Sequence, residues 1–116
     1  MDIRIVKAPI PFVEVEHVAL EQFGDVIKAV VDVEQGVMAL GPEMHAEGET
    51  LLMEQEGSKR EHTWGINLYP AKRGEDFLEF DSMINLKPAQ GNRSRDIEDA
   101  TVRAKIIAIV GKLVQK

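Results

Sequence analysis

The chain has 116 residues, a net charge of −6 at pH 7 and no cysteine. Its length fits one domain with its own core, and the lack of cysteine excludes disulfides, thiolate metal sites and thiol nucleophiles. The negative charge disfavours nucleic acid as a partner, and no apolar stretch reaches the roughly 20 residues of a membrane helix or resembles a signal peptide. We expect a soluble, cytoplasmic single domain over residues 1–116, with neither nucleic acid nor membrane as a partner.

The first half of the chain predicts a strand, a helix and a β-hairpin. Residues 3–6 are expected to form a short strand, and a proline precedes a helix over residues 12–23 whose apolar side chains share one face. Residues 26–33 are rich in β-branched side chains, and a short turn leads into residues 37–40. Two such strands joined by a glycine-containing turn are typical of a hairpin.

The middle of the chain predicts a second helix and a second hairpin. Residues 43–56 are expected to be helical, and strands are expected at 64–68 and 77–86. Along residues 77–86 the side chains alternate between two faces. The apolar face carries Leu78, Phe80, Ser82, Ile84 and Leu86, and the polar face carries Glu79, Asp81 and Asn85.

The last helix is expected over residues 96–115, because acidic residues occupy its first turn and lysines lie near its end. Its second half is apolar around most of its circumference. One stripe consists of Ile106, Ile109, Val110 and Leu113, and a neighbouring stripe consists of Ala104, Ile107, Gly111 and Val114. A helix packed on one side only does not require both stripes. We therefore predict burial on two sides, the second against another subunit of a homodimer.

The elements follow the order β-α-β-β-α-β-β-α, in which helices separate two hairpins. This order predicts an α+β fold, a two-layer sandwich in which one mostly antiparallel sheet of about five strands carries about three helices on one face. The opposite face of the sheet is expected to be polar, because Glu79 and Asp81 point away from the helices.

The segment after the last predicted strand has the chemistry to bind an anion. It consists of Gln90, Gly91, Asn92, Arg93, Ser94 and Arg95. A helix predicted to begin at Asp96 would add free N–H groups and partial positive charge, and the arginines could hold a phosphate or carboxylate. The alternative is an ordinary helix start, with Asp96 as N-cap and the arginines paired with surface acids. The leading hypothesis is the binding of a small phosphate- or carboxylate-bearing ligand at residues 90–96.

A second group of residues predicts a binding site for a divalent cation. Its members are Asp32, His45, Glu79 and Asp81. Glu79 and Asp81 stand two apart in a predicted strand, so they emerge about 7 Å apart on one side. Oxygen ligands suit Mg²⁺ or Ca²⁺, and paired carboxylates can transfer protons, which together predict a metal-assisted hydrolase or transferase. The competing interpretation is the solvated face of an ordinary antiparallel sheet.

Two further function classes depend on contacts that only the fold can make. A serine hydrolase requires Ser58 or Ser82 to meet His45 or His62. A non-catalytic, homo-oligomeric interaction module would use the apolar surface of residues 106–114.

Three stretches of the chain also carry a resemblance to other proteins. They read VVDVEQGVMALGPEMHAEGE, WGINLYP and EFDSMINLKPAQGNRSR. Together they resemble a small conserved prokaryotic protein family of unknown function, over most of the chain from about residue 23 to the last helix. The resemblance implies a bacterial or archaeal, cytosolic, single-domain protein, and it implies no activity, cofactor or catalytic residue.

Overall fold

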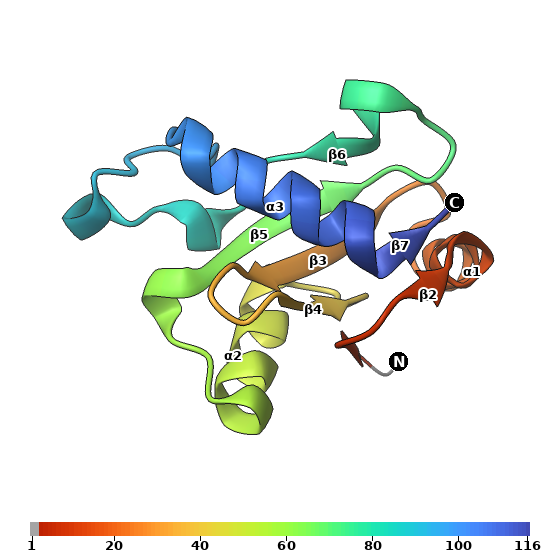
Figure 1. Ribbon diagram of the computed structural model, residues 1–116, viewed down its shortest axis with the longest axis horizontal. Coiled ribbons are helices and arrows are strands. Elements are labelled where there is room, and N and C mark those ends of the chain that lie inside the picture. The colour runs from red at the N-terminus through yellow and green to blue at the C-terminus, as the bar shows by residue number, and fades with distance from the viewer. Residues whose placement is uncertain (1–2) are drawn as a thin grey trace.

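A five-stranded antiparallel sheet forms the centre of the structure, a computed structural model that describes residues 3–116 (Figure 1). The strands, in spatial order, are β1 (Arg4–Val6), β4 (Val37–Leu40), β3 (Ile27–Asp32), β5 (Thr63–Leu68) and β6 (Leu78–Glu79). A separate parallel pair joins β2 (Ile10–Pro11) to β7 (Val114–Gln115). The helices are α1 (Phe12–Glu21), α2 (His45–Glu56) and α3 (Ala100–Leu113).

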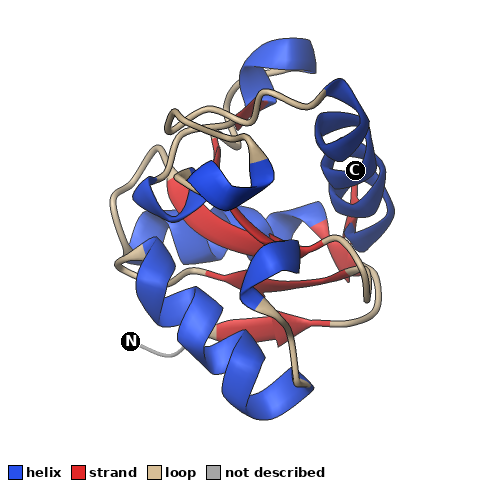
Figure 2. Ribbon diagram, turned by 90° about the vertical axis from the view of Figure 1, so that its left-hand side faces the viewer, coloured by secondary structure: helices blue, strands red, loops and turns tan. Residues whose placement is uncertain are grey.

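The sheet is apolar on both faces, and helices lie on both sides of it (Figure 2). On one face, α1 and α3 share a core with Val31 and Ile66. On the other face, Leu52 of α2 packs with Val30 and Ala39. Removing both faces from water supplies the main driving force for this arrangement.

The α+β class, the five-stranded antiparallel sheet and the three helices are confirmed. The prediction that all helices lie on one face of a two-layer sandwich is corrected by the position of α2. The physical reason lies in β3 and β4, whose Val30, Val37 and Ala39 make the second face apolar over this part of the sheet. Nearly continuous apolar runs of this kind are typical of strands buried on both faces.

Gly48 allows α2 to lie close to the sheet. A Cβ atom added at Gly48 would lie 2.9 Å from Cγ2 of Val30 and 3.4 Å from Cβ of Ala39. The first distance is too short for two carbon atoms, so a side chain at this position would push the helix away. Gly111 in α3 is the opposite case, because an added Cβ would meet no heavy atom within 4 Å.

We expect Gly48→Ala to lower the free energy of unfolding by about 1–2 kcal/mol, because overpacking outweighs the gain in helix propensity. Gly111→Ala should raise the same free energy by up to about 1 kcal/mol, since only the propensity gain applies there. Urea unfolding of the two variants measures both effects. Changes of the same sign and size would show that the sheet does not select glycine at position 48.

The strand predicted over residues 77–86 is largely wrong. Only Leu78–Glu79 pairs with β5, and a 3₁₀ turn at Met83–Asn85 follows. The reason is the side chain of Asn85, whose Oδ1 accepts a hydrogen bond from N of Gly65 at 2.8 Å and whose Nδ2 donates to O of Gly65 at 3.0 Å. An amide side chain therefore takes the place of a neighbouring strand beside Gly65. Asn85 was expected on an exposed face and is completely buried.

The last helix begins at Ala100 rather than at Asp96. Its N-cap is Asp99, whose Oδ1 accepts a hydrogen bond from N of Thr101 at 2.8 Å. Ile97 explains the shift, because its side chain is completely buried in the core. The irregular segment that places Ile97 there delays the start of the helix.

Candidate functional site

Residues 90–95, predicted to bind an anion, fold around a carboxylate of the protein itself. Oε2 of Glu98 accepts hydrogen bonds from N of Arg93 and from Oγ of Ser94, both at 2.9 Å. N of Glu98 donates to Oδ1 of Asn92 at 2.8 Å. Two of the donors expected to hold a ligand therefore hold the carboxylate of Glu98 instead.

The other polar groups of this loop stabilise its own conformation. Asn92 is buried, and its Nδ2 donates to three backbone oxygens at distances between 2.7 and 3.2 Å. Gln90 donates to the backbone oxygen of Glu61 at 3.0 Å. Gly91 has a φ of 82°, the left-handed conformation that ends a 3₁₀ turn at Pro88–Gln90. These contacts explain why the loop contains an amide, a glycine and a hydroxyl without a ligand.

Two of the three cations near the loop are engaged as well. Nε of Arg95 donates to Oδ1 of Asp81 at 2.6 Å. Nζ of Lys87 donates to the backbone oxygen of Arg60 at 2.6 Å, and burial lowers the pKa of Lys87. Arg93 is exposed and forms no ion pair with residues 3–116. Anion binding by residues 90–95 stays a prediction, supported by Arg93 alone.

The four residues predicted to hold a divalent cation do not converge. Asp32 pairs with the first residue of β5 and Glu79 with its fifth, so they lie near opposite ends of that strand. His45 donates from Nε2 to a backbone oxygen of β5 at 2.8 Å, and Asp81 forms the ion pair described above. Within residues 3–116, no three His, Asp or Glu side chains are grouped so that they could hold a metal ion.

Burial and hydrogen bonding shift the pKa values of Asp32 and His45. Burial alone would raise the pKa of Asp32, but hydrogen bonds from Ser58 and from the turn after β3 outweigh it and lower the pKa. Burial lowers the pKa of His45, although the hydrogen bond to the Ile66 carbonyl acts in the opposite direction. Asp32 is therefore an ionised structural carboxylate, and His45 is uncharged at neutral pH.

Neither serine considered as a nucleophile is hydrogen-bonded to a histidine within the described chain. Oγ of Ser58 donates to a carboxylate oxygen at 2.6 Å, although His62 lines the same small cavity of about 250 Å³. Ser82 and His45 both flank Gly65, but Cδ2 of His45 is the atom that faces this glycine. Ser82 is also almost completely buried. These contacts do not activate a serine.

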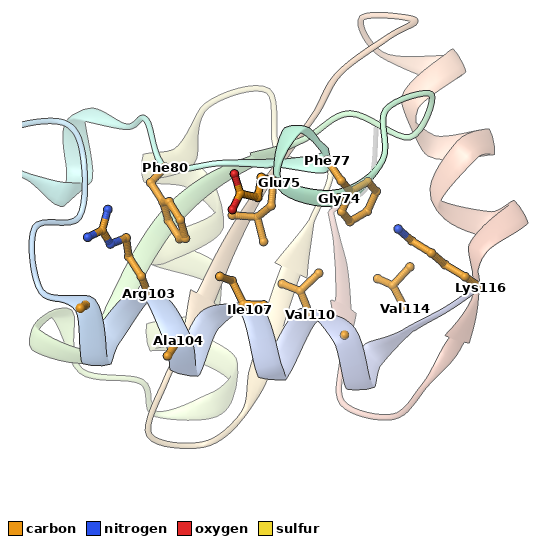
Figure 3. Close-up of a pocket in the computed structure, with 13 residues that line it drawn as sticks. Gly74, Glu75, Phe77, Phe80, Arg103, Ala104, Ile107, Val110, Val114 and Lys116 are labelled. Carbon is orange, nitrogen blue, oxygen red and sulfur yellow. The ribbon is translucent and has the colours of Figure 1, made fainter.

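An apolar groove lies between α3 and residues 74–80, which contain a 3₁₀ turn (Gly74–Phe77) and β6 (Figure 3). The cavity has a volume of about 800 Å³ and is termed the α3 groove. Its walls include Ala100, Arg103, Ala104, Ile107, Val110 and Gly111 from α3, and Phe77, Leu78 and Phe80 from the facing segment.

The α3 groove accounts for the second apolar stripe on α3. The first stripe packs in the core through Ile106, Val110 and Leu113. The second stripe faces the groove, where Ala104 and Gly111 are small and Ile107 is 55% exposed. The facing strand β6 is the edge of the sheet and only two residues long, so no further strand fills the space. Burial of this stripe against a second subunit stays a prediction.

Three charged side chains line the α3 groove. They are Glu75, Arg103 and Lys116. Nζ of Lys116 lies 3.9 Å from the ring centroid of Phe77, whereas Arg103 is partly buried and forms no ion pair with residues 3–116. The described residues that line the groove include no serine, threonine, tyrosine or histidine. The walls of the α3 groove are therefore mostly apolar, with one acidic and two basic side chains along them.

The structure is that of a small α+β protein with an open apolar groove and charged side chains along it. Residues 4–113 match the family described as "Protein of unknown function (DUF5674)", and the chain belongs to that family. The predicted membership of a conserved family of unknown function is thereby confirmed. No curated protein and no solved structure matches the chain. Within residues 3–116, no helix has the length and apolar character needed to span a membrane.

Proposed function

We propose that the protein binds a small anionic ligand with an apolar body, and that this ligand occupies the α3 groove. The observation that supports the proposal is a cavity of about 800 Å³ with apolar walls and two cationic side chains. Small-molecule sites usually have volumes of roughly 300–1,000 Å³, apolar walls and a few polar groups. The anionic class of ligand is the one predicted from the sequence. We place this ligand in the groove rather than at residues 90–95, because two of the donors there hold Glu98.

Binding fits the groove better than catalysis does. Its charged groups are Glu75, Arg103 and Lys116, and none of them is paired with a nucleophile in the lining. The metal-assisted hydrolase or transferase has no grouping of ligands in its favour among residues 3–116. A homodimer through α3 is the second candidate, favoured by the 55% exposure of Ile107. Such a dimer would cover the same groove and would therefore compete with the ligand.

Anilinonaphthalene sulfonate, an anionic dye with an apolar body, tests the proposal by fluorescence titration. We expect the dye to bind the native protein at one saturable site. Ala104→Phe should weaken this binding by at least about tenfold, because the ring fills the groove. Ala108→Phe is the matched control, since Ala108 is exposed on the same helix and does not line the groove.

The control variant should bind the dye as the original chain does, and thermal unfolding of both variants checks that they are folded, since partly unfolded proteins also bind the dye. Equal dye affinity in the two variants would contradict binding in the α3 groove.

A further inference from the structure

Arg103 is the side chain of the α3 groove that most narrowly defines the chemistry of a ligand. It precedes Ala104 and stands four residues before Ile107, so it lies on the groove side of α3 among apolar neighbours. In Figure 3 its guanidinium lies near Phe80 of the facing wall, at one end of the groove. Its side chain is partly buried and has no ion pair within residues 3–116. The planar guanidinium matches a carboxylate in two parallel hydrogen bonds.

Lys116 is less suited to anchor the acid group. Its ammonium lies 3.9 Å from the ring centroid of Phe77 and 5.6 Å from that of Phe12. Attraction to two aromatic faces already compensates part of this positive charge. Glu75 lines the same groove, and the chain has a net charge of −6. One uncompensated cation in these surroundings favours a ligand with a single negative charge over a phosphate or a dicarboxylate.

The shape of the apolar wall indicates an elongated ligand. Groove-lining residues recur along the whole of α3, from Ala100 to Gly111, and continue to Val114 (Figure 3). At a helical rise of about 1.5 Å per residue, the wall between Arg103 and Gly111 is roughly 12 Å long. Leu78 forms part of the facing wall. An extended alkyl chain covers such a surface with little polar desolvation.

We infer that the ligand is a monocarboxylic acid with an elongated aliphatic chain, bound with its carboxylate at Arg103 and its chain along α3 towards Phe77. This inference rests on the proposed function and adds the ligand's class and its orientation. The carboxylate completes the charge pair that Arg103 lacks, and the chain covers Ile107.

Displacement of the bound dye by straight-chain acids from hexanoate to dodecanoate tests the class of the ligand. Affinity should rise about fourfold for each added methylene that enters the groove. Decanoate should bind about tenfold or more tightly than decanol, because only the acid forms charge-assisted hydrogen bonds with Arg103. Equal affinity for the acid and the alcohol would overturn the inference and leave groove binding intact.

Three variants, each with one positively charged residue replaced by glutamine, test the orientation of the ligand in the groove. Arg103→Gln should remove the advantage of decanoate over decanol, while the affinity for decanol stays within about twofold. Lys116→Gln should keep most of that advantage, and Lys105→Gln, an exposed position outside the groove, should keep all of it. An equal loss in Arg103→Gln and Lys116→Gln would overturn the placement of the acid at Arg103. If neither the acid nor the alcohol displaces the dye, the inference fails, whereas the proposed function fails only if Ala104→Phe leaves the affinity for the dye unchanged.

Discussion

Asn85→Ala is expected to lower the free energy of unfolding by about 3–5 kcal/mol. The Asn85 side chain bonds to N of Gly65 at 2.8 Å, to O of Gly65 at 3.0 Å and to O of Arg95 at 3.0 Å. Asn85 is completely buried, so water does not replace the lost amide. Each buried backbone group left without a partner costs about 1–3 kcal/mol, and the substitution leaves both groups of Gly65 in that state.

Urea unfolding followed by circular dichroism measures this loss. Gln90→Ala is the control, because Gln90 is an exposed amide with one hydrogen bond to backbone, and its loss should stay within about 0.5 kcal/mol. Asn85→Asp provides a second variant, which keeps an acceptor for N of Gly65 and removes both donated bonds. A loss in Asn85→Ala no larger than in Gln90→Ala would show that the amide does not replace a strand.

Asn85 also shows why the alternation of residues 77–86 led to a wrong prediction. A period of two residues indicates a strand only if a neighbouring backbone supplies hydrogen bonds along its length. After Leu78–Glu79, a side-chain amide supplies them to Gly65 instead. This replacement of a strand by a side chain depends on a contact between residues 20 positions apart. The local sequence pattern does not contain that contact.

The first hairpin was predicted correctly because its determinants are local. Strands expected at residues 26–33 and 37–40 appear as β3 (Ile27–Asp32) and β4 (Val37–Leu40). β-branched residues favour the strands, and Gly36, with a φ of 70°, fits the turn between them. The burial of both faces was not predicted, although nearly continuous apolar runs such as those of β3 and β4 are typical of it.

The candidate site was visible in the sequence only in part. The second stripe on α3 predicted burial against a second subunit, which stays a prediction, and the side chains of this stripe line the α3 groove. Arg103 was missed, although an arginine four residues before Ile107 on an otherwise apolar face was a usable signal. The groove itself was not predictable from local patterns, because it exists only where the short edge strand β6 leaves α3 uncovered.

The polar residues predicted from the sequence to bind an anion or a cation share a structural role. Asn92 binds three backbone oxygens, Asp81 pairs with Arg95, and Asp32 binds a turn. Each of these side chains holds an irregular segment in a fold rich in 3₁₀ turns. Because such segments lack a ladder of backbone bonds, they need polar side chains for purely structural reasons. The hydrogen bonds of Asn92, Asp81 and Asp32 are therefore explained by the conformation of these segments, whether or not a ligand binds there.

Asp32→Asn is expected to lower the free energy of unfolding by about 2–4 kcal/mol near pH 7. Oδ1 of Asp32 accepts from N of Glu34 at 2.8 Å and from N of Gln35 at 3.1 Å. Oδ2 accepts from Nε2 of Gln35 at 2.9 Å and from Oγ of Ser58 at 2.6 Å. An asparagine amide would turn one of these acceptors into a donor that faces other donors. Asp32 is 1% exposed, so water does not relieve the mismatch.

The same substitution should remove a defined part of the pH dependence of stability. Burial would raise the pKa of Asp32, but its hydrogen bonds outweigh burial and lower it, below the value of about 3.9 for an unfolded chain. The folded state therefore binds the proton more weakly. The stabilisation is fully present above about pH 3.9 and is lost as the pH falls through the lower folded pKa.

Urea unfolding at several pH values between about 7 and 2 tests the direction of this pH dependence. The difference in unfolding free energy between the original chain and Asp32→Asn should be constant above the unfolded pKa and shrink below it. Asp76→Asn, at an exposed position, is the matched control for the removal of one carboxylate. A difference that stays constant down to about pH 2 would mean that the hydrogen bonds of Asp32 do not depend on its charge, because protonation would then leave their contribution unchanged.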